Sequence, residues 1–149
     1  MRTLPLNQTA TLGQLHSVLL PVPVNFPKGK VSVTLKIVGE ILAAFNHKDL
    51  DAIVESFHED GGFLLAAGAH PYGECFKGRN AIRTVFAERF AVVRELQWVD
   101  AHTWISSERA VTEWRLTGTG PINQLGCDLW TLRENKVLKK GTYYKPVTA

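Results

Sequence analysis

Apolar residues recur at three- and four-residue steps in the first half of the chain, which predicts amphipathic helices. One face of a first helix, ending near residue 47, carries Leu35, Val38, Ile41, Leu42 and Phe45. A second helix begins at the N-cap residue Asp49 and ends before the polar stretch 58–62, which is typical of a turn. After a short strand at 63–65, a third helix follows Gly78 with Ile82, Val85, Phe86 and Phe90 on one face.

In the second half of the chain the period changes to two, which predicts four strands. They span about 96–105, 110–118, 124–133 and 136–145. Because the links between them are short, we expect an antiparallel meander rather than a doubly wound parallel sheet. The pattern therefore predicts an α+β fold with the helices on one face of a curved sheet.

Composition fits one ordinary globular domain at 33–149, preceded by an N-terminal arm at 1–32. The arm has no clear period, and its prolines interrupt an apolar stretch before it reaches the length of a signal peptide or membrane span. Cys75 and Cys127 lack CxxC spacing, so neither a zinc site nor a disulfide framework is predicted. We expect a cytoplasmic protein without metal or cofactor. The net charge of +3 is too dispersed to indicate nucleic acid or a membrane as a partner.

Asp128 is the most informative residue, because it places a carboxylate inside a strand that otherwise appears buried. Such a group either finds a partner or holds its proton. Beside Arg115 or Lys140 it would be ionised, as a base or as half of an ion pair. Surrounded by Trp130 and leucines it would be protonated and could donate a hydrogen bond. The sequence leaves both alternatives open.

Several short motifs occur in order between about residues 33 and 145. They are Asp49-Leu50-Asp51-Ala52, Pro71-Tyr72-Gly73, Lys77-Gly78-Arg79-Asn80-Ala81-Ile82-Arg83, Thr112-Glu113-Trp114-Arg115-Leu116-Thr117-Gly118-Thr119 and Gly126-Cys127-Asp128-Leu129-Trp130. Together they resemble the nuclear transport factor 2-like superfamily, in its SnoaL-like and ketosteroid-isomerase-like branch. The resemblance implies a cone-shaped, cystatin-like α+β barrel, with three N-terminal helices packed on a curved, mainly antiparallel sheet. It also implies an interior pocket and a homodimer formed through the outer face of the sheet.

The resemblance supplies only part of a known catalytic site. Asp128 falls where ketosteroid isomerases carry a protonated carboxyl group that donates into the oxyanion hole. Their catalytic base would lie at Leu64 or Leu65, and their tyrosine near Ile41, so both positions are aliphatic in this chain. An aliphatic side chain cannot abstract a proton, which disfavours steroid isomerisation by that mechanism. The aspartate that related limonene epoxide hydrolases would place near Thr142 is also absent.

Strand alternation, with the register implied by the resemblance, predicts which side chains join Asp128 on the concave face. They are Glu113, Arg115, Thr117, Trp130, Leu132, Lys140, Thr142 and Tyr144. A glycine- and proline-containing loop is expected to bring His70 and Tyr72 to the pocket mouth. The candidate catalytic residues are therefore Asp128 and Glu113. The candidate ligand-binding residues are His70, Tyr72, Arg115, Trp130, Lys140, Thr142 and Tyr144.

Three functions fit these residues. The first is a cofactor-independent isomerase, cyclase or lyase, in which Asp128 moves a proton on a small apolar carbonyl compound with help from Glu113, His70 or Tyr144. The second is a non-catalytic domain that binds a small hydrophobic molecule or another chain. In the third, interior ion pairs fill the pocket and only dimerisation matters. Glu113 and Arg115 could also simply pair across strands on a wet face.

Overall fold

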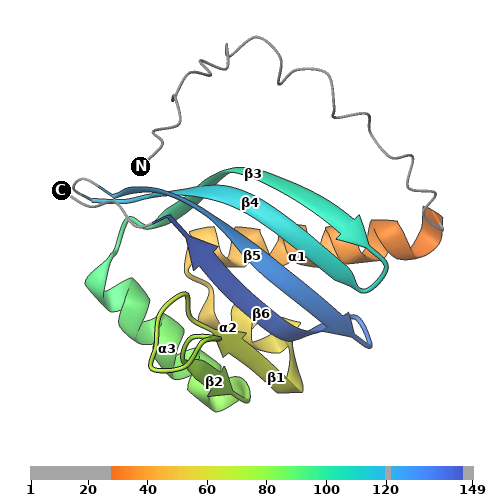
Figure 1. The fold of residues 1–149 in the computed structure, drawn as a ribbon, viewed down its shortest axis with the longest axis horizontal. Coiled ribbons are helices and arrows are strands. Elements are labelled where there is room, and N and C mark those ends of the chain that lie inside the picture. The colour runs from red at the N-terminus through yellow and green to blue at the C-terminus, as the bar shows by residue number, and fades with distance from the viewer. Residues whose placement is uncertain (1–27, 120–121, 146–149) are drawn as a thin grey trace, which may run out of the picture.

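In the computed structural model, three helices pack against one face of a curved six-stranded sheet (Figure 1). The structure describes residues 28–119 and 122–145, so most of the predicted arm, residues 1–27, lies outside the described residues. The helices are α1 (Lys28–His47), α2 (Leu50–Ser56) and α3 (Arg79–Val92). The strands are β1 (Phe57–Leu64), β2 (Cys75–Lys77), β3 (Gln97–Ser106), β4 (Arg109–Thr117), β5 (Asn123–Arg133) and β6 (Lys136–Tyr144).

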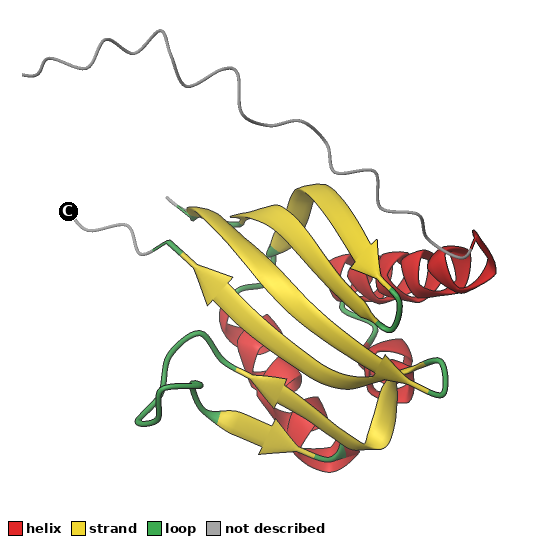
Figure 2. Cartoon of the chain, turned by 45° about the vertical axis from the view of Figure 1, so that its right-hand side comes forward, coloured by secondary structure: helices red, strands yellow, loops and turns green. Residues whose placement is uncertain are grey.

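The strand order is β2-β1-β6-β5-β4-β3. All neighbours are antiparallel except β1 and β6, which are parallel. Figure 2 shows the sheet curving in front of the helices without closing into a complete barrel. The predicted α+β class, the three helices and the antiparallel meander are thus confirmed. Across residues 28–119 and 122–145, no helix is both long and apolar enough to cross a membrane.

The helices pack their predicted apolar faces against the core, with one exception on α1. Along α1 the buried stripe consists of Thr34, Val38, Ile41, Ala44 and Phe45. Leu35 is exposed, because it lies about 100° around the helix from Thr34. The predicted cap of α2 is confirmed, since the side chain of Asp49 accepts a hydrogen bond from the backbone N–H of Ala52.

The prediction of a turn at 58–62 is wrong, because this polar stretch belongs to strand β1. Phe57 pairs with Val137 and Gly62 with Lys139 of β6, with a register shift between the two pairs. The backbone at this register shift needs a glycine at position 61, since a Cβ on Gly61 would lie 2.7 Å from the carbonyl oxygen of His58. The sequence analysis also missed β2, which is only three residues long and pairs with β1. Both strands depend on partners outside their own local pattern.

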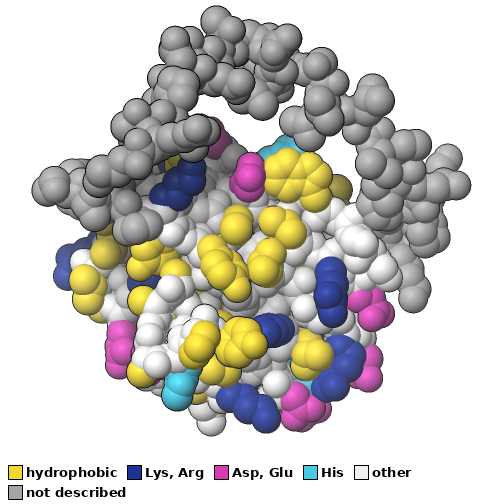
Figure 3. Space-filling view, in the orientation of Figure 1, with side chains coloured by type: hydrophobic (Ala, Val, Ile, Leu, Met, Phe, Trp, Pro, Cys, Tyr) yellow, Lys and Arg dark blue, Asp and Glu magenta, His cyan; other side chains and the backbone are white. Residues whose placement is uncertain are grey.

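The core between helices and sheet is rich in aromatic side chains. Phe86 of α3 lies 4.8 Å, between ring centroids, from both Phe45 and Phe63. Trp98 and Trp130 extend this cluster across the sheet and are buried. The opposite face of the sheet is uncovered in the single chain, and hydrophobic side chains gather over its middle (Figure 3). The sheet therefore has a filled inner face and an exposed, partly apolar outer face.

Candidate functional site

Asp128 is fully buried on the inner face of β5, and its carboxylate accepts three side-chain hydrogen bonds. Lys140 Nζ lies 2.5 Å and Thr142 Oγ1 2.7 Å from Oδ1, while Trp114 Nε1 lies 2.9 Å from Oδ2. All three groups donate to Asp128. Of the alternatives that the sequence left open, the structure therefore shows the carboxylate as an acceptor beside Lys140, not as a hydrogen-bond donor.

The register of three strands assembles this cluster. On β6, Thr142 lies opposite Asp128 and Lys140 lies opposite Trp130. On β4, Trp114 lies opposite Gly126, and a Cβ at Gly126 would be 2.3 Å from the indole Cη2 of Trp114. The missing side chain at Gly126 thus allows the indole to lie across β5 and reach the carboxylate.

Lys140 is almost as deeply buried as its partner, and aromatic rings surround it. Its Nζ lies 4.8 Å from the ring centroid of Phe63, 5.2 Å from that of Trp130 and 5.5 Å from that of Phe45. Burial lowers the pKa of Lys140, and the charge of Asp128 and its hydrogen bond act in the opposite direction. Lys140 also donates to Thr142 Oγ1 over 2.8 Å. The cluster satisfies its own polar groups, as the ion-pair alternative required.

A cavity of about 130 Å³ remains beside this cluster, at the end of the cone nearest the end of β6. Its polar lining comes from Arg89 of α3 and from Lys140, Thr142 and Tyr144 of β6. Its apolar lining includes Phe63, Leu65, Phe86, Trp98 and Trp114. The predicted concave positions on β6 therefore do line an interior space.

The sequence analysis missed two polar groups of the site, the indole N–H of Trp114 and the guanidinium of Arg89. Arg89 is the charged one of the two. Its Nε is buried and has no hydrogen-bond partner within the described part of the chain. Burial lowers the pKa of Arg89, with Tyr144 and then Asp128 acting in the opposite direction. A usable signal was present, because Arg89 lies four residues after Val85 and three after Phe86, which puts an arginine beside the apolar stripe of the helix.

From Arg89 a second hollow continues as an apolar groove of about 580 Å³ between α3 and the adjoining ends of β4 and β5. Leu65 and Arg89 line both the cavity and the groove. The apolar residues of the groove are Val85, Val92, Val93, Leu96, Leu116 and Ile122. The interior space thus has a polar end at the strands and an apolar extension along α3.

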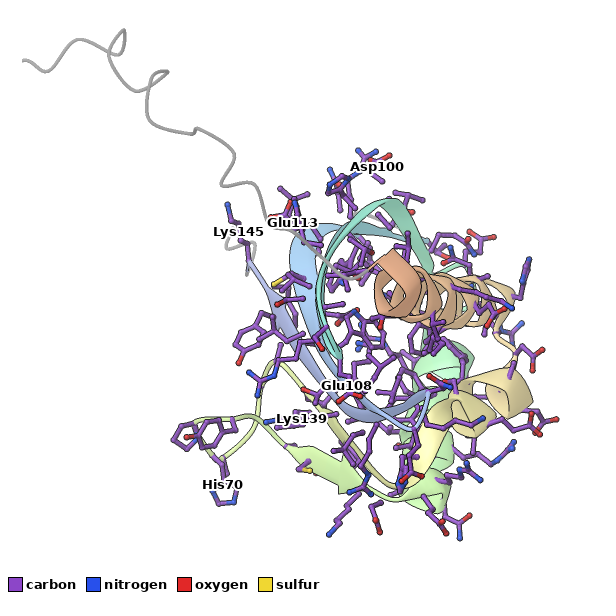
Figure 4. The ribbon with its side chains drawn as sticks, turned by 90° about the vertical axis from the view of Figure 1, so that its right-hand side faces the viewer. His70, Asp100, Glu108, Glu113, Lys139 and Lys145 are labelled. Carbon is purple, nitrogen blue, oxygen red and sulfur yellow. The ribbon has the colours of Figure 1, made fainter. Side chains whose placement is uncertain are left out.

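The predicted inner face of β4 is wrong by one residue. Glu113 and Arg115 are exposed, whereas the buried residues of β4 are Ala110, Thr112, Trp114 and Leu116. Figure 4 shows Glu113 on the side of the sheet away from the helices. Arg115 pairs there with Asp100, at 2.5 Å between Nη2 and Oδ2. Since alternate residues of a strand point to opposite faces, a shift of one position moved the whole set, Thr117 included.

His70 and Tyr72 lie on the loop between β1 and β2, and neither lines the interior cavity. His70 points away from the body of the domain (Figure 4). Tyr72 is 75% exposed and borders a groove of about 860 Å³ on the outer face of the sheet, along with Leu129, Lys139 and Tyr143. The expectation that this loop brings His70 and Tyr72 to the interior pocket is therefore not met. The start of the loop, at Leu65, does reach the cavity.

The fold and its interior site define a small α+β domain of the nuclear transport factor 2-like class. The sequence model of the SnoaL-like domain matches residues 38–139, which is more than half of the chain. The chain therefore belongs to the SnoaL-like domain family, and the resemblance found in the sequence is confirmed. No curated protein sequence gives a significant match.

Similar solved structures agree with this assignment. Bal32a from a soil-derived mobile gene cassette is 20% identical with a TM-score of 0.68, over 77% of this chain and 91% of that chain. A candidate polyketide cyclase from Xanthomonas campestris pv. campestris is 20% identical with a TM-score of 0.65, over 76% and 91%. A candidate ketosteroid isomerase from Kribbella flavida is 14% identical with a TM-score of 0.68, over 79% and 82%. Similarity at these identities establishes the fold alone.

Proposed function

We propose that this protein binds a small organic molecule inside the cone, without transforming it, in the cavity beside Lys140 and the groove that continues from it. The observation that carries the proposal is that these two spaces are neighbours, since Leu65 and Arg89 line both of them. The cavity alone is smaller than typical ligand sites of about 300–1,000 Å³. With the groove included, the space reaches that range. Aromatic walls with a few converging polar groups are characteristic of such sites.

Binding without catalysis is favoured because Asp128, the candidate catalytic carboxylate, is fully buried and does not line the cavity. Asp128 already accepts from Trp114, Lys140 and Thr142. Leu65, one of the two positions expected for the family's base, lines the cavity as an aliphatic side chain. The names of the similar proteins, a candidate polyketide cyclase and a candidate ketosteroid isomerase, support small organic molecules as ligands of this fold.

A variant with a filled groove tests this proposal. Val85→Trp should weaken the binding of fragments found by ligand-observed NMR at least about tenfold, because the indole would occupy the space they need. Val33→Trp is the control, since Val33 is exposed on α1 and outside the groove. Fragments that bind both variants equally well, or a complete lack of binding fragments, would contradict an interior ligand site.

The second candidate is the proton-transfer enzyme, and one observation favours it. Lys140 lines the cavity, and burial lowers the pKa of its amine, as in lysines that act as acids or bases. Mass spectrometry after long incubation with each bound carbonyl fragment separates the two functions. An unchanged mass supports binding alone. A product whose formation stops in Lys140→Met and in Asp128→Asn would instead establish catalysis.

We also propose that two copies associate through the outer face of the sheet. Its exposed hydrophobic residues are Trp104, Leu125, Leu129 and Tyr143, one or two from each of β3, β5 and β6. Stable monomers rarely expose contiguous apolar patches much larger than a few hundred Å². The groove of about 860 Å³ on the same face offers a place for side chains of a second copy.

Light scattering coupled to size-exclusion chromatography tests this association. Leu129→Glu should convert a dimer into a monomer, because it would place a charge in the middle of the apolar face. Leu35→Glu introduces the same charge at a comparably exposed leucine of α1 and should leave the mass unchanged. A wild-type protein that remains monomeric at high micromolar concentration would refute the proposed dimer.

A further inference from the structure

We propose that the interior ligand is an amphipathic monoanion: a molecule with one carboxylate that pairs with Arg89 and an apolar body that lies in the groove along α3. This inference rests on the proposed function and adds the chemical class of the ligand. Three observations lead to it: the charges around the cavity, the sizes of the two connected spaces, and the position of Arg89 between them.

The charges around the cavity leave one cation uncompensated. Asp128 and Lys140 form a hydrogen-bonded ion pair whose net charge is zero. Arg89 stays protonated because of the very high pKa of a guanidinium group. Within residues 33–119 and 122–145, no carboxylate forms an ion pair with it, although Glu88 also borders the groove. The site therefore carries one positive charge that a ligand could neutralise.

The sizes of the two spaces determine where each part of the ligand fits. A water molecule occupies about 30 Å³, so the cavity of about 130 Å³ holds a head group and few further atoms. The groove of about 580 Å³ has mainly apolar walls, including Val93, Leu96 and Ile122. An apolar chain is favoured there because it removes both its own surface and that of the groove from water.

Arg89 lies where the two spaces meet, since it lines both of them. Its buried Nε has no hydrogen-bond partner among the residues whose positions are described, so a donor is left unused at the junction. An unpaired buried donor costs free energy, and a carboxylate matches the planar fork of a guanidinium. Tyr144 and Lys140 also line the cavity, so further polar groups lie beside the same space as Arg89.

A pair of matched probes tests the proposal: hexanoate, and hexanamide as its neutral analogue of nearly equal shape. Binding is followed by two-dimensional NMR on the indole N–H of Trp114, which lines the cavity. Hexanoate should bind the wild-type protein at least about tenfold more tightly than hexanamide, as expected for a charge-assisted hydrogen bond. Arg89→Gln should abolish this preference, whereas Arg94→Gln, which removes the same charge from a nearby exposed position, should retain it.

The outcomes distinguish this inference from the proposed function. If both probes bind with equal affinity, or if Arg89→Gln keeps the preference for hexanoate, interior binding stands and the pairing with Arg89 is wrong. If neither probe perturbs Trp114 while neutral fragments bind in the groove, the anionic class alone is overturned. If no fragment binds either, both proposals fail. The comparison of probes in the wild-type protein decides the question even if Arg89→Gln does not fold.

Discussion

Replacing Lys140 with methionine is expected to lower the free energy of unfolding by about 3–5 kcal/mol, because it leaves the Asp128 carboxylate buried without its cation. Thr142 and Trp114 would remain as its hydrogen-bond donors. Neither of them carries a charge. The effect is measured by urea denaturation of the variant and the wild-type protein, followed by circular dichroism.

The control for Lys140→Met is the double variant Lys140→Met with Asp128→Leu, which removes both charges from the core. Apolar replacement of a whole buried ion pair is often neutral or stabilising, so most of the lost free energy of unfolding should return. A single variant that costs less than about 1 kcal/mol would mean that water or a repacked side chain satisfies the carboxylate. The ion pair with Lys140 would then not be what compensates the buried carboxylate of Asp128.

Gly126→Ala is expected to lower the free energy of unfolding by about 3 kcal/mol, through overpacking and the loss of a charged hydrogen bond. Its Cβ would lie 2.3 Å from Cη2 of Trp114 and 2.5 Å from the backbone oxygen of Tyr143. The indole must move to relieve the first clash, and it then loses its contact with Asp128. The second clash is with backbone, which yields less easily, so it strains the pairing of β5 with β6. The NMR signal of the Trp114 indole N–H should shift along with the loss of stability.

Gly39→Ala provides a matched control for the same chemical change. A Cβ at Gly39 would have no atom within 4 Å, and the residue lies in the interior of helix α1. There the substitution should raise the free energy of unfolding by about 0.5–1 kcal/mol, because alanine favours the helix. Equal effects at the two glycines would show that the close packing of Trp114 against Gly126 does not hold in solution.

Local periodicity predicted those elements whose faces are set by neighbours in the sequence. The helices and the four-stranded meander repeat their apolar residues over many positions, so their class was clear from the sequence. Strand β1 is different, because Phe57 is held by Val137, a residue far along the chain, and its glycines locally favour a turn. No periodicity within 57–64 carries that information.

The candidate site was predicted only in part, for two separate reasons. Asp128 and Lys140 were placed on the same face correctly, because the register implied by the family resemblance holds for β5 and β6. The face of β4 was assigned from the register of the family that the chain resembles. The structure instead buries Trp114 and Leu116, whose apolar side chains favour that opposite face in the sequence as well. Arg89 was missed because a charged residue in a helix usually indicates solvent, and its spacing from Val85 and Phe86 was not weighed against that expectation.

The parallel pairing of β1 with β6 also bears on how the chain folds during synthesis. Among the described residues, strands β1 and β2 join the rest of the sheet only through β6, which is synthesised after the other five strands. Such long-range pairings slow folding, because a large loop must close before its contacts form. The Asp128–Lys140 pair is completed at the same moment, since Lys140 is itself part of β6. A nascent chain that stops short of β6 therefore leaves β1 and β2 detached from the meander and Asp128 without its cation. Such an incomplete domain exposes apolar surface of the kind that chaperones bind.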